Sequence, residues 1–235
     1  CFPHVVNISV QTFLKVLAEP IAPYDASIDY TADDAPQDVV ACARNIVTAV
    51  RSSGQRRAHL QEIIEQGNKN GDWKAPPKDN GENDPPDVLR VVRLLRDVET
   101  RWSSTYIMID RLLELYIAVD KMLRDSKYAN TELAQLCLSK PQLDALRDIR
   151  EFLLAPHLTQ HCVAAQKTPT LSVVLPLYAK LIDTLKKFKL LLPKISHGIQ
   201  AAIDKLEEYM EKSRHTQAYA AAMGESCRTS SFFPC

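Results

Sequence analysis

Apolar residues recur at spacings of three and four along most of this 235-residue chain. Between residues 103 and 124 one helical face carries Ile109, Leu112, Tyr116, Val119 and Leu123. No convincing run alternates polar and apolar residues in the way that marks a half-buried strand. The pattern predicts a mainly α protein, with one or two strand residues at most, at the extreme start or near residues 91–98.

The same spacing predicts where the helices begin and end. We expect helices over residues 4–18, 36–53, 55–66, 103–124, 140–165, 168–192 and 194–212, with a short one near 216–223. Proline or glycine follows several of them, and we expect Gly54 to end the second helix and Gly67 to end the third. No internal repeat of fixed period is visible, which disfavours a solenoid.

A polar stretch separates the third and fourth predicted helices. Residues 68–87 contain four prolines and two glycines, with Trp73 as the large apolar side chain, which predicts a surface loop or linker. The Val- and Leu-rich segment 88–98 follows, and we expect Leu89, Val92 and Leu95 to share a face with Trp102.

The composition excludes several classes of function. Lys and Arg number 29 against 29 Asp and Glu, so overall charge does not favour a nucleic-acid binder, although a local basic face stays open. No apolar run approaches the roughly 18 residues of a membrane span. The six glycines are scattered, which excludes Walker and dinucleotide-binding loops. The six cysteines form no C-x-x-C pair and indicate reduced thiols.

Two groups of residues carry potential metal ligands. Cys1 and His4 form a C-x-x-H pair, and His157 and His161 lie one helical turn apart next to Cys162. A tetrahedral zinc site needs further ligands, and the Glu of a zincin motif is missing. We therefore favour structural roles for both groups and predict no metal site. No catalytic nucleophile set is evident either.

Five arginines concentrate within 22 residues: Arg90, Arg93, Arg96, Arg101 and Arg111. Four acidic residues in or beside this stretch nearly cancel them. Arg101 and Trp102 together offer a cation for phosphate and a flat ring for a base. The alternative, which is the commoner arrangement, is a buried aromatic anchor beside a surface charge.

Four blocks along the chain resemble those of hAT-family DNA transposases. CFPHVVNI at 1–8 is similar to the family's C-x-x-H-x-x-N-L segment, and RDVETRWSSTY at 96–106 to its R-D-x-x-T-R-W-x-S-T-Y block. TPTLSVVLPLY at 168–178 and AAIDKLEEY at 201–209 resemble its P-T-L…V-L-P-x-Y and A-x-x-K-L-x-x-Y blocks. The blocks occur in the family's order, and T-R-W-x-S-T-Y is the most specific of them.

The resemblance implies an RNase H-like core interrupted by a long helical insertion domain. Intact family enzymes bind a divalent metal such as Mg²⁺ or Mn²⁺ through two aspartates and a glutamate. The C-x-x-H of Cys1 and His4 would lie near that active site, just after the second aspartate, and the glutamate would follow residue 209. We therefore expect a fragment without catalytic residues: core edge with a strand end and a helix at 1–20, helical insertion domain at 21–223, and a divergent tail at 224–235.

Two hypotheses of function follow, besides a disfavoured third in which the chain is an active nuclease. In the first, this is a nuclear transposase fragment, inactive as a nuclease and without a cofactor of its own, that contacts a DNA hairpin or flanking end through Arg96, Arg101, Trp102 and Ser103. In the second, it is a helical protein-interaction module that binds a protein partner or itself, without DNA. We also expect that a domain separated from its core leaves Val10, Phe13 and Leu17 without packing partners.

Overall fold

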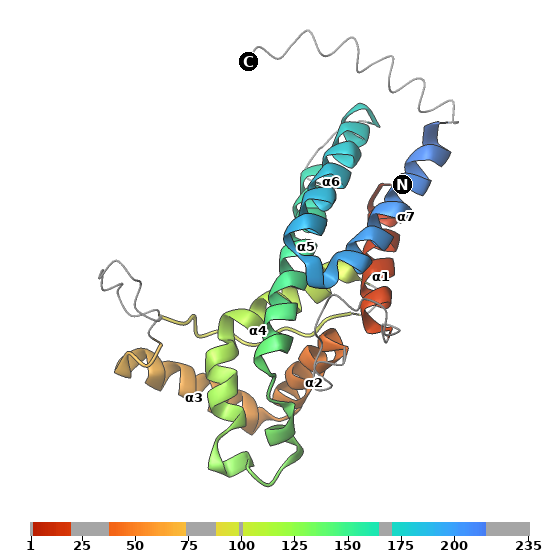
Figure 1. The fold of residues 1–235 in the computed structure, drawn as a ribbon. Helices are drawn as coiled ribbons and strands as arrows, with labels where there is room; N and C mark the ends of the chain where they lie inside the picture. The colour runs from red at the N-terminus through yellow and green to blue at the C-terminus, as the bar shows by residue number, and fades with distance from the viewer. Residues whose placement is uncertain (1, 20–37, 74–87, 99–100, 165–170, 215–235) are drawn as a thin grey trace, which may run out of the picture. The chain divides into compact units, whose positions relative to one another are not determined.

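The computed structural model describes residues 2–19, 38–73, 88–98, 101–164 and 171–214 (Figure 1). These residues form seven α-helices: α1 Phe2–Ala18, α2 Val39–Ser52, α3 Gly54–Asn70, α4 Trp102–Leu123, α5 Lys140–Ala164, α6 Leu171–Leu191 and α7 Ser196–Arg214. Short 3₁₀ helices lie at Ser126–Tyr128, Glu132–Leu136 and Pro193–Ile195. Among the described residues, the β-structure is limited to one isolated antiparallel bridge between Val98 and Arg101. The prediction of a mainly α protein is confirmed.

The chain divides into two compact units, one of residues 1–36 with 148–235 and one of residues 37–147. The residues of α5 are divided between the units. The domain boundaries predicted near residues 20 and 223, and the short helix near 216–223, lie outside the described residues and stay predictions. Of the described helices, none combines the length and the apolar character needed to cross a membrane.

In the first unit, α1 packs closely against α7. The Ser9 hydroxyl donates a hydrogen bond to the carbonyl of Ala202 over 2.9 Å. A side chain on Gly198 would begin 3.0 Å from the ring of Phe13, so glycine allows this close approach. The Phe13 ring also stacks on Phe152 of α5, with 3.8 Å between centroids. The expectation that Val10 and Phe13 lack packing partners is therefore wrong, since both are buried by the helices of their own unit.

In the second unit, α4 is the central helix. It contacts α2, α3 and the Glu132–Leu136 turn, so it buries more than the narrow stripe that its heptad-like spacing predicts. The predicted positions Ile109, Leu112, Val119 and Leu123 are buried, and Tyr116 is half-buried. Further buried positions, which the prediction missed, are Met108, Leu115, Ala118 and Met122.

The boundaries of α2 and α3 differ from the prediction. Gly54 begins α3 instead of ending α2, and Ser53 alone separates the two helices. The helix α3 then continues past Gly67 to Asn70, where Gly71 adopts a left-handed conformation with φ of 69°. Gly71 therefore ends the helix, as glycine commonly does, and Gly67 has a different role in packing Trp73.

The segment Val88–Val98 is extended and lies in the second unit. The Asn68 side chain of α3 holds its start, because its amide donates to the carbonyl of Leu89 and accepts from the Leu89 N–H. Leu94 is the buried residue of the segment, at 2% exposure. Leu89, Val92 and Leu95 are half-buried, and their expected shared face with Trp102 stays a prediction.

Candidate nucleic-acid interface

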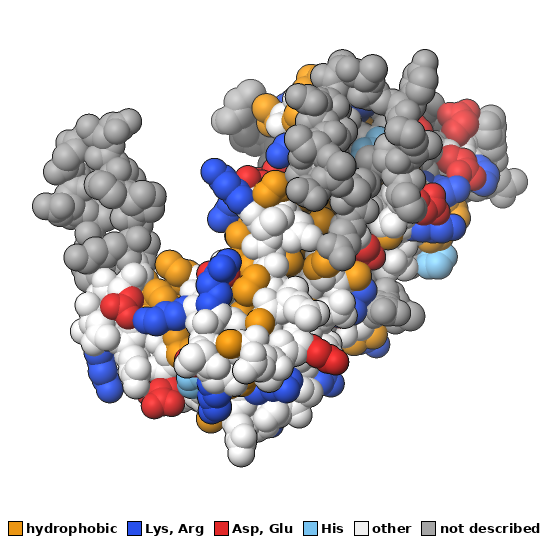
Figure 2. Space-filling model, turned by 60° about the horizontal axis from the view of Figure 1, so that its bottom comes forward, with side chains coloured by type: hydrophobic (Ala, Val, Ile, Leu, Met, Phe, Trp, Pro, Cys, Tyr) orange, Lys and Arg blue, Asp and Glu red, His pale blue; other side chains and the backbone are white. Residues whose placement is uncertain are grey.

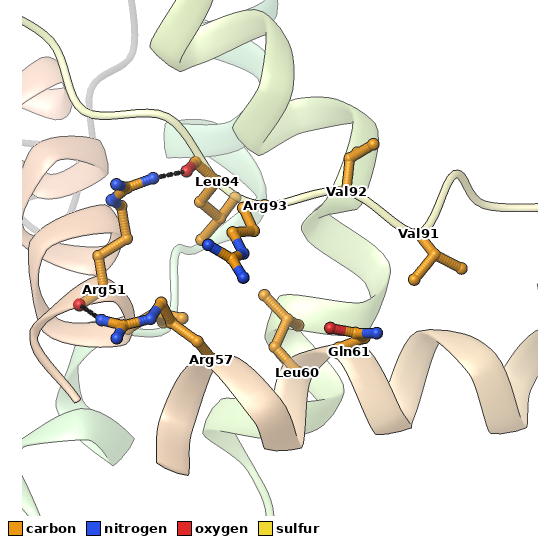
Figure 3. Close-up of a pocket in the computed structure, with 9 residues that line it drawn as sticks. Arg51, Arg57, Leu60, Gln61, Val91, Val92, Arg93 and Leu94 are labelled. Atoms are coloured by element: carbon orange, nitrogen blue, oxygen red, sulfur yellow. Dashed lines mark hydrogen bonds between the residues drawn. The ribbon is translucent and has the colours of Figure 1, made fainter. Parts of the chain in front are cut away.

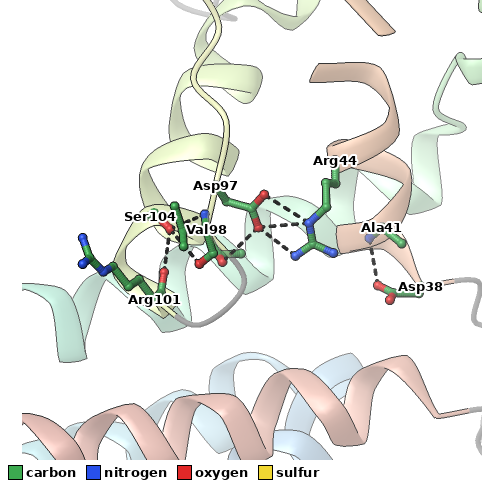
Figure 4. Close-up of polar contacts among 8 residues, drawn as sticks. Asp38, Ala41, Arg44, Asp97, Val98, Arg101 and Ser104 are labelled. Atoms are coloured by element: carbon green, nitrogen blue, oxygen red, sulfur yellow. Dashed lines mark hydrogen bonds and ion pairs between the residues drawn. The ribbon is translucent and has the colours of Figure 1, made fainter. Parts of the chain in front are cut away.

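The junction between the extended segment and α4 is fixed by a small hydrogen-bond network (Figure 4). The N–H of Arg101 donates to the carbonyl of Val98 over 2.7 Å, and the Val98 N–H donates to the Ser104 hydroxyl over 2.8 Å. The Ser104 hydroxyl also lies 2.6 Å from the carbonyl oxygen of Arg101. These bonds hold Arg101 as the residue that immediately precedes α4, with an exposed side chain.

Asp97 is turned away from this surface and toward α2. Its carboxylate accepts two close bonds from Arg44, at 3.0 Å from Nε and 2.7 Å from Nη2. Thr105 lies 3.3 Å from the same carboxylate. The Asp97 side chain is 4% exposed, so its charge is used in an inward ion pair, and it does not pair with the exposed arginines beside it (Figure 4).

Glu114 of α4 binds two further arginines of the cluster. Arg90 donates to it over 2.5 and 2.6 Å, and Arg111 lies 3.0 Å away. The hydrogen bond from Arg90, with the positive charges of both arginines, lowers the pKa of Glu114. Arg90 and Arg111 therefore share the single negative charge of Glu114.

Arg93, Arg96 and Arg101 differ from these paired arginines. All three are exposed, and none has a carboxylate partner among the described residues. Elsewhere basic side chains are interspersed with acidic ones, as Figure 2 shows for one face of the molecule. Since overall charge is zero, any attraction for a polyanion must come from such local groups.

The predicted site residues other than Arg96 and Arg101 have varied environments. Trp102 is 2% exposed, so its ring is packed inside the unit and is not open to a nucleic-acid base in this structure. This corrects the stacking role expected for Trp102 and matches the alternative of a buried anchor beside a surface charge. Ser103 is half-buried in the first turn of α4. His4 is exposed in α1, and Cys1 lies outside the described residues.

The second group of potential ligands lies near the end of α5. The His157 and His161 rings meet edge to face, with centroids 4.5 Å apart, and Cys162 is exposed. Within the described part of the chain, no three His, Cys, Asp or Glu side chains gather as metal ligands would.

A pocket that the sequence did not predict lies in the second unit, where the α2–α3 corner meets the extended segment (Figure 3). Its cavity measures about 90 Å³. Arg51 comes from the last turn of α2, Arg57 from the first turn of α3, and Arg93 from the extended segment. About 40 residues separate Arg93 from the other two, so no local motif could indicate their convergence.

The described residues form a helical domain, and a family model assigns this domain to a transposase-derived class of protein. The model of the ZBED1 RNase-like helical domain matches residues 1–152, which is more than half of the chain, and the chain belongs to this family. The match supports a hAT-like, transposase-derived protein. It includes the junction at Arg101 and the arginine pocket. No curated protein and no solved structure matches the chain significantly.

Proposed function

We propose that this chain is a DNA-contacting helical domain of a hAT-like, transposase-derived protein, acting in the nucleus without cutting DNA itself. The observation that carries the proposal is the arrangement at the junction before α4. Arg96 and Arg101 are exposed there and lack carboxylate partners among the described residues, while Asp97 between them pairs inward with Arg44. The partner would be a DNA hairpin or a flanking end.

Phosphate contact is the chemistry that this arrangement fits. Arginine donates several N–H groups to phosphate oxygens, and such contacts supply most sequence-independent affinity for DNA. The first turn of α4 contains no acidic residue, so the positive end of the helix dipole adds to the attraction for an anion. The half-buried Ser103 in that turn offers a hydroxyl donor beside Arg101.

Trp102 has a supporting role in this proposal. Its buried ring packs the first turn of α4 into the unit and so keeps Arg101 at a fixed position on the surface. Position rather than base stacking is therefore the contribution that we assign to Trp102.

Removal of the two charges tests the proposal. The affinity of the double variant Arg96→Gln/Arg101→Gln for a labelled DNA hairpin at low salt should be lower by about tenfold or more. The reason is that each lost charged hydrogen bond contributes on the order of 1 kcal/mol or more. Lys127→Gln is the matched control, since Lys127 is exposed beyond the other end of α4. Equal affinity of the double variant and the control would refute the proposal.

The proposal assigns binding to the chain and no catalytic step. Supercoiled plasmid incubated with the purified chain and either Mg²⁺ or Mn²⁺ should stay intact. Metal-dependent nicking that copurifies with the chain would contradict this part of the proposal.

A second candidate function is a helical protein-interaction module, favoured by one apolar surface. Leu190 and Leu191 at the end of α6 are 82% and 70% exposed, and exposed apolar side chains of this size commonly mark contact surfaces when they cluster. Sedimentation would detect self-association as a mass that rises with concentration and falls in Leu190→Lys/Leu191→Lys. An unchanged monomer mass together with salt-dependent DNA binding would favour the first function.

A further inference from the structure

Three guanidinium groups line the pocket at the α2–α3 corner without an acidic residue among its described lining. Arg51, Arg57 and Arg93 share it with Gln61 and apolar side chains such as Leu60. Figure 3 shows Arg93 reaching from the extended segment toward α3, on the side where Arg51 and Arg57 lie. The cavity of about 90 Å³ exceeds the roughly 10–15 Å³ that one water requires, so a small anion is of suitable size.

The protein satisfies these arginines only in part. Arg51 donates through Nη1 to the carbonyl of Leu94, and Arg57 donates through Nη1 to the carbonyl of Arg51. The Nε of Arg51 is buried and has no hydrogen-bond partner in the described structure. Carbonyl groups accept hydrogen bonds but carry no net charge, so the positive charges of the pocket remain uncompensated there.

The first turn of α3 adds partial positive charge to one side of the pocket, whereas Arg51 lies at the partially negative C-terminal end of α2. Arg57 lies in the first turn of α3, where no acidic residue is present. The N-terminal end of a helix carries partial positive charge, so a cation at this position is unfavourable on its own. A bound anion would offset the unfavourable interaction of Arg57 with the N-terminal end of α3, and it would reduce the repulsion between the guanidinium groups.

We propose that this pocket is a binding site for a phosphate group, held by hydrogen bonds from Arg57 and Arg93, with the guanidinium of Arg51 adding a third positive charge to the lining. Three guanidinium groups match the several acceptor oxygens of phosphate. The site uses none of the residues proposed above for DNA contact, so it stands independently of Arg96 and Arg101. The phosphate is either a free inorganic ion or a phosphate group of a nucleic acid.

Thermal denaturation with inorganic phosphate tests the site. At constant ionic strength, phosphate in place of chloride should raise the melting temperature of the unaltered chain, and calorimetric titration should give a saturable isotherm. Arg93→Gln should weaken phosphate affinity at least about tenfold. The Arg93 guanidinium makes no hydrogen bond or ion pair with the described residues, so this variant should fold as the parent does.

Arg56→Gln and Arg57→Gln form a matched pair. Both arginines donate from the first turn of α3 to carbonyls near the end of α2, Arg56 to Ala49 over 2.9 Å and Arg57 to Arg51. Arg57 lines the pocket and Arg56 does not. Arg57→Gln should lose the phosphate response, and Arg56→Gln should keep it. No phosphate response in the parent, or an equal response in both variants, would overturn the proposal.

Competition distinguishes the two sources of phosphate. A 5′-phosphorylated oligonucleotide that displaces inorganic phosphate, when its unphosphorylated form does not, assigns the pocket to a terminal nucleic-acid phosphate. Displacement by both forms assigns it to the DNA backbone, and displacement by neither assigns it to the free ion. The Arg96→Gln/Arg101→Gln variant should keep the phosphate response in each case, so failure of the DNA proposal and failure of the pocket proposal give different results.

Discussion

The indole ring of Trp73 occupies the position that a side chain on Gly67 would take. An ideal Cβ at Gly67 would overlap the six-membered part of the ring. The chain reverses between them, with the Asp72 N–H donating to the carbonyl of Gly67 over 2.9 Å. Trp73 is consequently 3% exposed, and Lys121 of α4 lies 5.5 Å from its ring centroid. Because Gly67 has no side chain, the Trp73 ring can pack against α3, and this contact holds the end of the helix to the rest of the unit.

Gly67→Ala should therefore destabilise the protein, although alanine favours helices. The added methyl group must displace the ring, and overpacking of this kind costs about 1–3 kcal/mol. Gly54→Ala is the control, since the nearest atom to its Cβ would be the flexible end of Arg57 at 3.7 Å. Urea unfolding should show a lower midpoint for Gly67→Ala only, and equal midpoints for the two variants would contradict the packing described here.

Arg44→Gln should destabilise the protein through the carboxylate of Asp97. That side chain is 4% exposed, and loss of its partner leaves a buried charge, at a cost of about 1–3 kcal/mol or more. Arg147→Gln is a suitable control because the Arg147–Asp144 pair is exposed and such pairs contribute about 0–1 kcal/mol. Chemical denaturation measures both, and a similar loss in each would show that the Asp97 pair is no stronger than a surface pair.

Trp102→Leu should separate packing from base stacking. Leucine keeps an apolar side chain in the buried position but offers no flat ring, so stability should fall while DNA affinity of the folded variant stays within about twofold of the parent. Stacking on a base would contribute on the order of 1–3 kcal/mol. Anisotropy measured well below the melting temperature checks this, and a tenfold loss of affinity would restore the stacking role to Trp102.

His197 should make stability depend on pH. Burial lowers the pKa of its ring, and its Nε2 has no hydrogen-bond partner among the described residues. In the unfolded chain the His197 ring takes up a proton near pH 6.5, whereas in the folded chain it does so only at lower pH. The free energy of unfolding should therefore be unaffected by His197 above about pH 6.5 and should decrease as the pH falls below that value.

The matched variants for this effect are His197→Gln and His161→Gln, since His161 is exposed in the same unit. Melting curves between pH 7.5 and 5.5 should show a smaller loss of stability in His197→Gln than in the parent. His161→Gln should follow the parent, and a pH profile that His197→Gln leaves unchanged would show that His197 is not the titrating group.

The helices could be predicted from sequence because each presents an apolar face with the periodicity of a helix. The buried positions of α2, among them Ala43, Ile46 and Val50, follow that pattern directly. The end of α3 could not be predicted, because glycine at 67 serves a contact with Trp73 rather than a helix terminus. Likewise, Leu94 is buried in an extended segment whose Val and Leu residues carry no clear period.

The candidate site could be predicted only in part. Arg96 and Arg101 are evident in sequence as members of an arginine cluster, but their freedom from acidic partners depends on the inward turn of Asp97 to Arg44, across 53 positions. The burial of Trp102 and the convergence of Arg51, Arg57 and Arg93 are likewise tertiary facts. A sequence pattern gives the charges present and leaves their pairing open.

The salt dependence of hairpin-DNA binding tests the central claim most directly. Each phosphate contact contributes a slope of about −0.9 to the logarithm of affinity against the logarithm of salt concentration. We predict a linear decline for the parent chain, with a slope shallower by about 1.8 in Arg96→Gln/Arg101→Gln. The slope for Lys127→Gln should differ from that of the parent by no more than about 0.3. Identical slopes for the parent and the double variant would contradict the claim that Arg96 and Arg101 contact DNA phosphates.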